Sequence, residues 1–181
     1  RELLGLEPDD LLQLGGAGLG LLRRRARRGA RLRGGACRVT GAPSLDGIVA
    51  EARLSREATL QALGLEAGAR YALVLFHPVV QEAQEAYAQT LALRQALERT
   101  VIASGRQVVW LDPNADAGGG GILQALDGAG VRRIRHLARD LYLAALRHAD
   151  LLAGNSSSGI IEAASLGTPV VNVGSRQNAR Q

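Results

Sequence analysis

The chain has 181 residues, with 22 basic side chains against 17 acidic ones and a formal net charge of +5. This length is enough for one α/β domain with its own core. The one cysteine, Cys37, excludes an internal disulfide and indicates a reducing compartment, so a cytoplasmic location is expected. No apolar run approaches the roughly 20 residues of a membrane span, so no membrane partner is expected. Methionine is absent, which we interpret as the sign of a fragment of a longer protein.

The positive charge is concentrated in one short segment. Seven arginines lie between Arg23 and Arg33, and the remaining 15 are outnumbered by the 17 acidic residues. Because the rest of the chain is slightly acidic, the charge does not favour nucleic acid as a partner. The arginine cluster either binds an acidic partner or is a solvated segment. Residues 1–36 show no clean period and predict no defined element.

From residue 37 onward, segments of strand length alternate with helical ones. A strand-like segment at 37–40 and a Gly-Pro turn at 41–44 precede a predicted helix at 45–63. The pattern then becomes regular. Strands are predicted at 71–76, 107–111, 131–135, 149–153 and 168–174, and helices at 80–104, 118–129, 139–148 and 160–166.

This alternation predicts an α/β fold, a Rossmann-like parallel sheet with helices on both faces. Ligands of such sheets bind beyond the carboxyl ends of the strands. A polar group or a loop follows each of the five regular strands, so these groups should meet at one edge of the sheet. The convergence favours a phosphate-bearing ligand over a purely structural domain. The groups are His77, Asn114, His136-Leu137, Ser156-Ser157 and Arg176.

The most informative motif is Gly154-Asn155-Ser156-Ser157-Ser158-Gly159, between a predicted strand and a predicted helix. A helix N-terminus presents unpaired N–H groups and a partial positive charge, which suit a phosphate. Small residues let the anion approach, and serine hydroxyls add donors. The alternative interpretation is a serine that caps an ordinary helix.

Four further residues each have two interpretations. His77 either donates to a phosphate or bonds a neighbouring loop, and Asn114 either lies at the ligand or only forms a turn. Glu162, one turn past the serines, either accepts hydrogen bonds from a ribose diol or is a favourable charge in the first helical turn. Arg176 either binds a diphosphate with its forked guanidinium or is a surface arginine.

Other chemistries lack their motifs. His136 and His148 have no acidic or cysteine partners at metal-ligand spacing, so no metal site is predicted, and no cofactor is expected. The chain has no lysine, which excludes a Gly-Lys-Ser/Thr phosphate loop. The glycine run 118–121 is not followed by a dinucleotide fingerprint, and the serines do not form the Gly-x-Ser-x-Gly motif of a hydrolase.

Taken together, these motifs resemble the UDP-N-acetylglucosamine 2-epimerase family, particularly its hydrolysing branch. The resemblance covers about residues 38–181, and His-Pro-Val after the first regular strand points to the hydrolysing branch. The segments that carry it are 39–46, Phe76-His77-Pro78-Val79, 113–118, 154–162 and 167–177.

The resemblance implies two Rossmann-like domains arranged as in GT-B glycosyltransferases, with UDP in the cleft between them. Residues 1–36 would be a poorly defined remnant of the first domain, 37–46 the crossing, and 47–181 a UDP-binding second domain truncated at its C-terminus. By resemblance, the diphosphate would be held by His77, Ser156, Ser157 and Arg176. Glu162 would take the ribose hydroxyls, the backbone at Leu137 would face uracil, and Asn114 would lie beside the nucleotide.

The family reaction removes the C2 proton and UDP from the sugar, and water then adds to release N-acetylmannosamine. His77 would assist departure of UDP, whereas the family's acid and base carboxylates belong mostly to the first domain. The chain alone is therefore expected to bind UDP without turnover, and the full-length protein to form a homo-oligomer. A diacetylated bacillosamine-type substrate stays open, as do a GT-B glycosyltransferase and a non-catalytic nucleotide-binding fragment.

Overall fold

The computed structural model describes residues 41–177. The predicted strand at 37–40 and the segment 1–36 lie outside the described residues. A single turn of 3-10 helix, Pro43–Leu45, opens the described part. None of the helices within residues 41–177 is both long enough and apolar enough to cross a membrane.

Five parallel strands form one sheet in the order β3-β2-β1-β4-β5. Each of them corresponds to a predicted strand, which confirms the predicted parallel α/β fold. The central strand β1 is buried along its whole length, which explains why its sequence is continuously apolar. The strands are β1 (Tyr71–Leu75), β2 (Gln107–Leu111), β3 (Arg132–Ile134), β4 (Leu151–Gly154) and β5 (Val170–Asn172).

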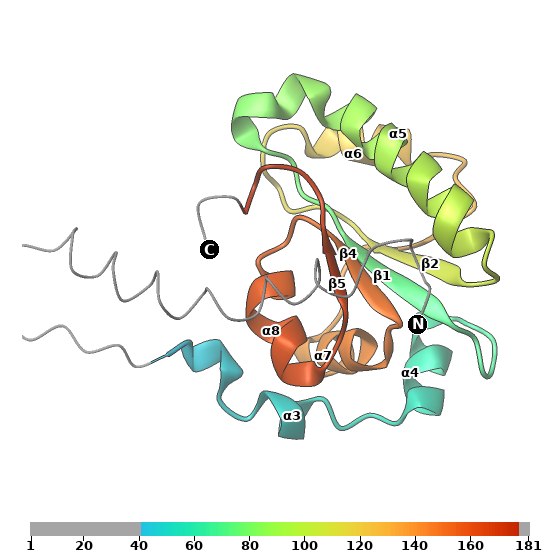
Figure 1. Cartoon of the computed structure of the whole chain (residues 1–181), viewed down its shortest axis with the longest axis vertical. Coiled ribbons are helices and arrows are strands. Elements are labelled where there is room, and N and C mark those ends of the chain that lie inside the picture. Colours follow the sequence, from blue (N-terminus) through green and yellow to red (C-terminus); the bar gives the residue numbers. More distant parts are fainter. Residues whose placement is uncertain (1–40, 178–181) are drawn as a thin grey trace, which may run out of the picture.

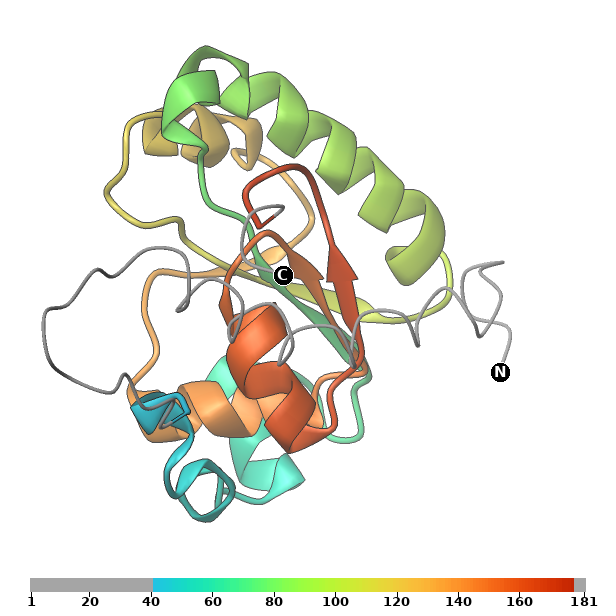
Figure 2. The ribbon, with the colours of Figure 1, turned by 60° about the vertical axis from the view of Figure 1, so that its left-hand side comes forward.

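Helices cover both faces of this sheet (Figure 1). The chain steps from β1 through β2 to β3 in one direction and then returns to β4 and β5 on the other side of β1. Because parallel crossovers are right-handed, the helices of the two halves fall on opposite faces. Figures 1 and 2 show α5 (Ala86–Leu97) and α6 (Gly119–Ala125) on one side. The other side carries α3 (Ile48–Glu51), α4 (Arg56–Leu63), α7 (Arg139–His148) and α8 (Ser158–Leu166).

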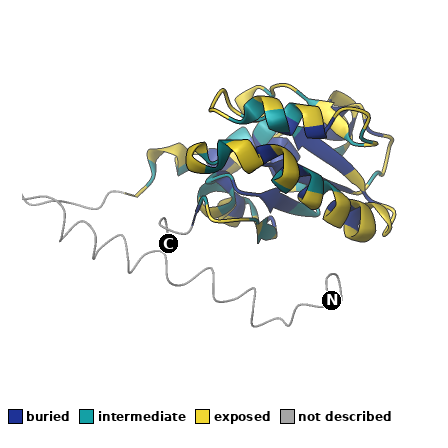
Figure 3. Cartoon of the chain, turned by 90° about the horizontal axis from the view of Figure 1, so that it is seen from above, coloured by how far each residue is buried: buried dark blue, intermediate teal, exposed yellow. Residues whose placement is uncertain are grey.

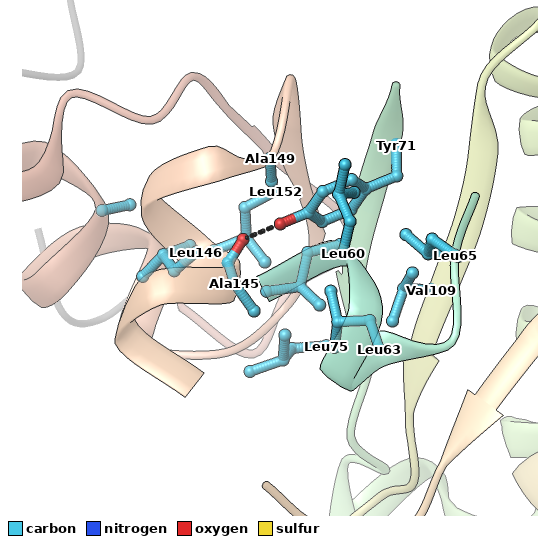
Figure 4. Close-up of a cluster of buried hydrophobic side chains, with 12 residues drawn as sticks. Leu60, Leu63, Leu65, Tyr71, Leu75, Val109, Ala145, Leu146, Ala149 and Leu152 are labelled. Carbon is cyan, nitrogen blue, oxygen red and sulfur yellow. Dashed lines mark hydrogen bonds between the residues drawn. The ribbon is translucent and has the colours of Figure 1, made fainter. Parts of the chain in front are cut away.

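The alternating side chains of β1 feed two hydrophobic clusters. Tyr71, Leu73 and Leu75 belong to the cluster beneath α4 and α7, and Ala72 and Val74 to the one beneath α5 and α6. In the first cluster the Tyr71 hydroxyl donates to the Ala145 carbonyl at 2.7 Å (Figure 4). Burial raises the pKa of Tyr71, so the phenol stays a neutral donor. Figure 3 shows the buried sheet between helices whose outer faces are exposed.

Two predicted helices differ from the structure. The predicted helix at 45–63 is broken, because α3 ends at Glu51 and α4 begins again at Arg56. Ser55 causes the restart, since its Oγ accepts from the Ala58 N–H at 3.1 Å, and serine favours such a cap over a helix interior.

The second predicted helix that differs from the structure is the one at 80–104. It divides into a 3-10 segment Val80–Glu85, the helix α5 and a π-helical turn Glu98–Ile102. Glu82 leaves helical geometry there, with φ −116° and ψ 22°. Its carboxylate accepts from Gln89 at 2.8 Å and from Ser175 at 3.1 Å, so this segment is tied to the loop after β5.

Candidate functional site

The loop between β4 and α8 lies directly against β1. Gly154 has φ +137°, and a Cβ atom built there would lie 2.0 Å from the Leu75 carbonyl oxygen. Only glycine allows this approach without strain. At the other end of the loop, a Cβ atom at Gly159 would lie 2.9 Å from the Val170 side chain. The glycines predicted to admit an anion therefore also set the contacts of the loop with its neighbouring strands.

Asn155 joins this loop to the end of β1. Its side chain is buried, with 2% exposed, and its backbone N–H donates to the Leu75 carbonyl at 3.0 Å. The side-chain Oδ1 accepts from the His77 N–H, and Nδ2 donates to the His77 carbonyl, both at 2.7 Å. The amide thus continues the pairing of β1 and β4 beyond the last residues of both strands.

The ring of His77 is held in one orientation by the loop after β2. The Asn114 backbone N–H donates to Nδ1 at 3.2 Å, so the neutral ring carries its proton on Nε2. Burial lowers the pKa of His77, the charge of Arg176 lowers it further, and Asp116 opposes them. His77 is therefore a neutral Nε2–H donor near pH 7. Its bond to the neighbouring loop matches one of the two sequence interpretations, and donation to a phosphate stays a prediction.

Arg176 reaches the same edge from the end of β5. Its Nη1 donates to the Asn155 carbonyl at 3.2 Å, and Gln177 Nε2 donates to that carbonyl at 2.6 Å. The arginine is half-buried, so it is not a free surface side chain. It borders a hollow of about 340 Å³ beside the end of β1, with walls formed by residues 78–81, Asp116, Ser175 and Arg176.

The serines open α8. The Ser157 side chain makes no capping hydrogen bond, and Ser156 Oγ accepts from the Ser158 N–H at 3.3 Å. Among residues 41–177, no group accepts a hydrogen bond from the backbone N–H of Ser156 or Ser157. Ser157 makes no cap, but Ser156 makes the bond expected of a capping serine, so the alternative interpretation of a serine cap holds for Ser156. The helix N-terminus keeps donors that suit an anion.

Tyr142 of α7 fixes the first turn of α8, because its hydroxyl is hydrogen-bonded to that of Ser158. Burial raises the pKa of Tyr142 to about 12, the bond with Ser158 lowers it, and the charge of Glu162 raises it further. Glu162 is half-buried in the same helix. Its placement fits either interpretation of the residue.

Asn114 and Leu137 have other surroundings. Asn114 is exposed and its Nδ2 donates to Asp116 at 2.6 Å, which is the behaviour of a turn residue. Its backbone nevertheless holds His77. Leu137 lies between β3 and α7 with its side chain packed against the cluster beneath α4 and α7. Hydrogen bonds join His77, Asn114 and Arg176 into one group around Asn155, whereas Leu137 and Glu162 stand outside this network.

Sequence reasoning missed Asn155, Tyr142 and Gln177 as supporting residues. The sequence offers a signal for Asn155, because this polar residue follows an apolar strand and a glycine. A polar side chain in a buried loop needs hydrogen-bond partners. The sequence offers no such signal for Tyr142, since its partner lies 16 residues away across a helix packing contact.

The fold and this edge define a Rossmann-like α/β domain of the kind that carries its ligand site at the carboxyl ends of its strands. The chain belongs to the UDP-N-acetylglucosamine 2-epimerase family, whose family profile matches residues 32–181.

Two curated relatives each align over 145 positions, which cover 78% of the chain. It is 41% identical to a UDP-N,N'-diacetylbacillosamine 2-epimerase (hydrolyzing) of Legionella pneumophila. It is 32% identical to a UDP-N-acetylglucosamine 2-epimerase of Neisseria meningitidis. In both cases the aligned part spans 37% of the relative, so the chain covers little more than a third of their length.

A solved structure supports the fold. The crystal structure described as a UDP-N-acetylglucosamine 2-epimerase from Listeria monocytogenes matches 77% of this chain and 37% of its own, with a TM-score of 0.56 and 18% identity. At this identity the likeness concerns the fold alone. It shows that this chain shares its α/β fold with part of that protein.

Proposed function

We propose that the full-length protein is a hydrolysing UDP-sugar 2-epimerase and that this chain is its UDP-binding half. Family membership supports the reaction class. The observation that carries the proposal is the edge itself. Asn155 bonds the His77 backbone with its side chain and Arg176 with its carbonyl, and it directly precedes the serines that open α8. Neutral donors, a cation and a helix N-terminus in one place suit the two phosphates of UDP.

In this proposal the diphosphate is bound by His77 Nε2, Arg176, and the hydroxyl and N–H groups of Ser156 and Ser157. Glu162, farther along α8, accepts hydrogen bonds from the ribose hydroxyls. The Leu137 backbone faces uracil, and Asn114 lies beside the nucleotide. Support is strongest for His77 and Arg176, which the hydrogen bonds around Asn155 bring to one place.

The proposed reaction begins when a base removes the C2 proton of the sugar. The electron pair forms a C1–C2 double bond, the bond from C1 to the diphosphate oxygen breaks, and UDP leaves. Water then adds its hydroxyl to C1 while C2 regains a proton on the opposite face, which gives the free epimerised sugar. His77 and Arg176 stabilise the charge that develops on the leaving diphosphate. The residues that move the C2 proton belong to the remainder of the full-length protein, so this chain alone binds UDP without turnover.

The two relatives carry different substrates in their names, a diacetylated bacillosamine and N-acetylglucosamine. From the sequence we assign UDP-N-acetylglucosamine as the substrate and N-acetylmannosamine as the product. The product would serve amino-sugar biosynthesis of the sialic-acid type. The higher identity to the Legionella relative favours the diacetylated sugar as a second substrate.

The test is to incubate the full-length protein separately with both UDP-sugars and to follow UDP and free sugar by chromatography. We expect equal amounts of UDP and a C2-epimerised free sugar from at least one of them. Intact nucleotide sugar after long incubation with folded protein would contradict the proposal. A product that forms only with an added acceptor would indicate a glycosyltransferase instead.

We also propose a cytoplasmic homo-oligomer for the full-length protein, as the sequence predicted. The domain assignment, with residues 1–36 as part of a first domain and 37–46 as the crossing, is a proposal too. Light scattering of the full-length protein tests the oligomer, and a single-subunit mass would contradict it.

A further inference from the structure

One buried residue connects three strand ends of the candidate site. Asn155 follows β4, its amide bonds both backbone groups of His77 after β1, and its carbonyl accepts from Arg176 and Gln177 after β5. The backbone N–H of Asn155 is used as well, by the Leu75 carbonyl. Every hydrogen-bonding group of this residue is therefore engaged with a neighbouring strand end.

The chemistry of these contacts requires an amide. A donor and an acceptor must point side by side at the N–H and C=O of one residue, as the N–H and C=O of an opposite residue do in an antiparallel pair of strands. Aspartate offers only acceptors, and serine is too short to bridge both groups. Pro78 follows His77 and restricts it to extended conformations, which keeps its two backbone groups available for this pairing.

The amide also determines where the His77 ring lies. Asn155 holds the backbone of His77, and the Asn114 N–H bonds Nδ1 of its ring. The other ring nitrogen, Nε2, therefore has one direction and one protonation state. The same residue holds Arg176 through its carbonyl. A rotation of the loop at Asn155 would displace the neutral donor and the cation together.

We propose that Asn155 is a positioning residue that holds His77 and Arg176 in one anion-binding arrangement without touching the ligand. The proposal rests on the proposed function for its ligand, UDP. It assigns the buried amide a role in binding the leaving group, beyond a role in packing the loop.

The experiment compares Asn155→Ala and Asn155→Asp with the unaltered full-length protein. UDP affinity is measured by calorimetry, and the protonated nitrogen of His77 by ¹⁵N NMR of histidine-labelled protein without ligand. His77→Gln identifies the His77 signal. For Asn155→Ala we expect roughly 10- to 100-fold weaker UDP binding and a mixture of Nδ1- and Nε2-protonated forms in place of the Nε2 form, because about two hydrogen bonds of ordinary strength are lost.

A matched control is Thr168→Val. It removes a buried hydrogen bond of 2.8 Å, from Thr168 Oγ1 to the Leu146 carbonyl, at the other end of β5. We expect it to lower stability without changing UDP affinity or the His77 signal. A loss of UDP affinity in the control equal to that of Asn155→Ala would overturn the positioning role.

Asn155→Asp keeps the shape of the side chain and decides the question if the alanine variant does not fold. It loses the donor to the His77 carbonyl, so weaker UDP binding is again expected. Unchanged affinity together with an unchanged Nε2 form would overturn the proposal. If the unaltered protein itself does not bind UDP, the proposed function fails, while the His77 signal still tests whether Asn155 positions the ring.

Discussion

The two edges of the sheet use their charged residues differently. At the amino-terminal edge, Asp150 accepts from Arg70 and Arg106, both at 2.8 Å, and Arg56 donates to the His148 and Ala69 carbonyls at 2.7 Å. At the carboxyl edge, the His77 ring accepts from the Asn114 N–H, Arg176 donates to the Asn155 carbonyl, and the charge of Arg176 lowers the pKa of His77. The charged groups named at the amino-terminal edge are used in ion pairs and hydrogen bonds that stabilise the fold. The carboxyl edge combines a cation, a neutral imidazole and a helix N-terminus, and within residues 41–177 no carboxylate is bonded to any of the three.

The same contrast holds for the histidines. The ring of His148, at the end of α7, bonds through Nε2 to the Leu54 carbonyl at 3.0 Å, so this nitrogen is used in packing α7 against the segment before α4. His77 uses only Nδ1 within the described part of the chain. A histidine after the carboxyl end of a strand is therefore a candidate for binding, whereas one at the end of a helix near the amino-terminal edge is used in packing.

The largest expected effect comes from glycines at the two edges. Gly154→Ala should lower the free energy of unfolding by about 3 kcal/mol or more, because it combines positive φ with a Cβ placed on the Leu75 carbonyl. Gly68→Ala, at the amino-terminal edge, has φ +77° but no described atom within 4 Å, and should cost only about 1 kcal/mol. Urea denaturation of both variants measures the difference in the free energy of unfolding. Equal losses would contradict the close approach of Gly154 to the Leu75 carbonyl.

Arginine substitutions should separate stability from binding. Arg106→Ala removes a buried partner of Asp150 and should lower the free energy of unfolding by about 2 kcal/mol while leaving UDP affinity unchanged. Arg176→Ala should weaken UDP binding roughly 10- to 100-fold, as the loss of a charged hydrogen bond implies, with little effect on unfolding. Calorimetric titration and denaturation of both variants give the four values. If Arg106→Ala lost UDP binding and Arg176→Ala did not, the assignment of UDP binding to the carboxyl edge would be contradicted.

Ser157→Ala should have a smaller effect, about 1 kcal/mol or roughly fivefold in UDP affinity, because only one neutral hydroxyl is lost and the backbone donors stay. Ser165→Ala is the control, since Ser165 is an exposed serine near the other end of α8. Titration with UDP distinguishes them, and equal affinities in the two variants would remove the Ser157 hydroxyl from the site.

The smallest expected effect is proton uptake at His77. Burial and Arg176 lower its pKa in the folded chain, so the unfolded chain binds a proton below about pH 6.5 before the folded one does. His77 therefore destabilises the fold as the pH falls through that range. A bound diphosphate would raise the pKa again, so UDP binding near pH 6 should take up less than one proton. Calorimetry in buffers of different ionisation enthalpy measures this, with His77→Gln as the control; equal proton uptake in that variant would exclude His77 as its source.

The sequence alone was enough to predict the sheet, because alternating apolar strands and helices determine a doubly wound fold almost regardless of detail. It was also enough to place His77, Ser156 and Arg176 at one edge, since parallel strands end on the same side. The bond from Ser175 to Glu82 joins residues 93 apart, which no local pattern contains. The cap of Ser55 on Ala58 is local, and the helical pattern at 45–63 concealed it. The sequence indicated that Asn155 needs hydrogen-bond partners but not which ones, because they follow two other strands.

The most direct test is a crystal structure of the full-length protein with UDP bound. We expect diphosphate oxygens within hydrogen-bond distance of His77 Nε2, the Arg176 guanidinium and the first N–H groups of α8, with Asn155 still bonded to the His77 backbone. A diphosphate bound elsewhere, or a His77 ring turned away from it, would contradict the account.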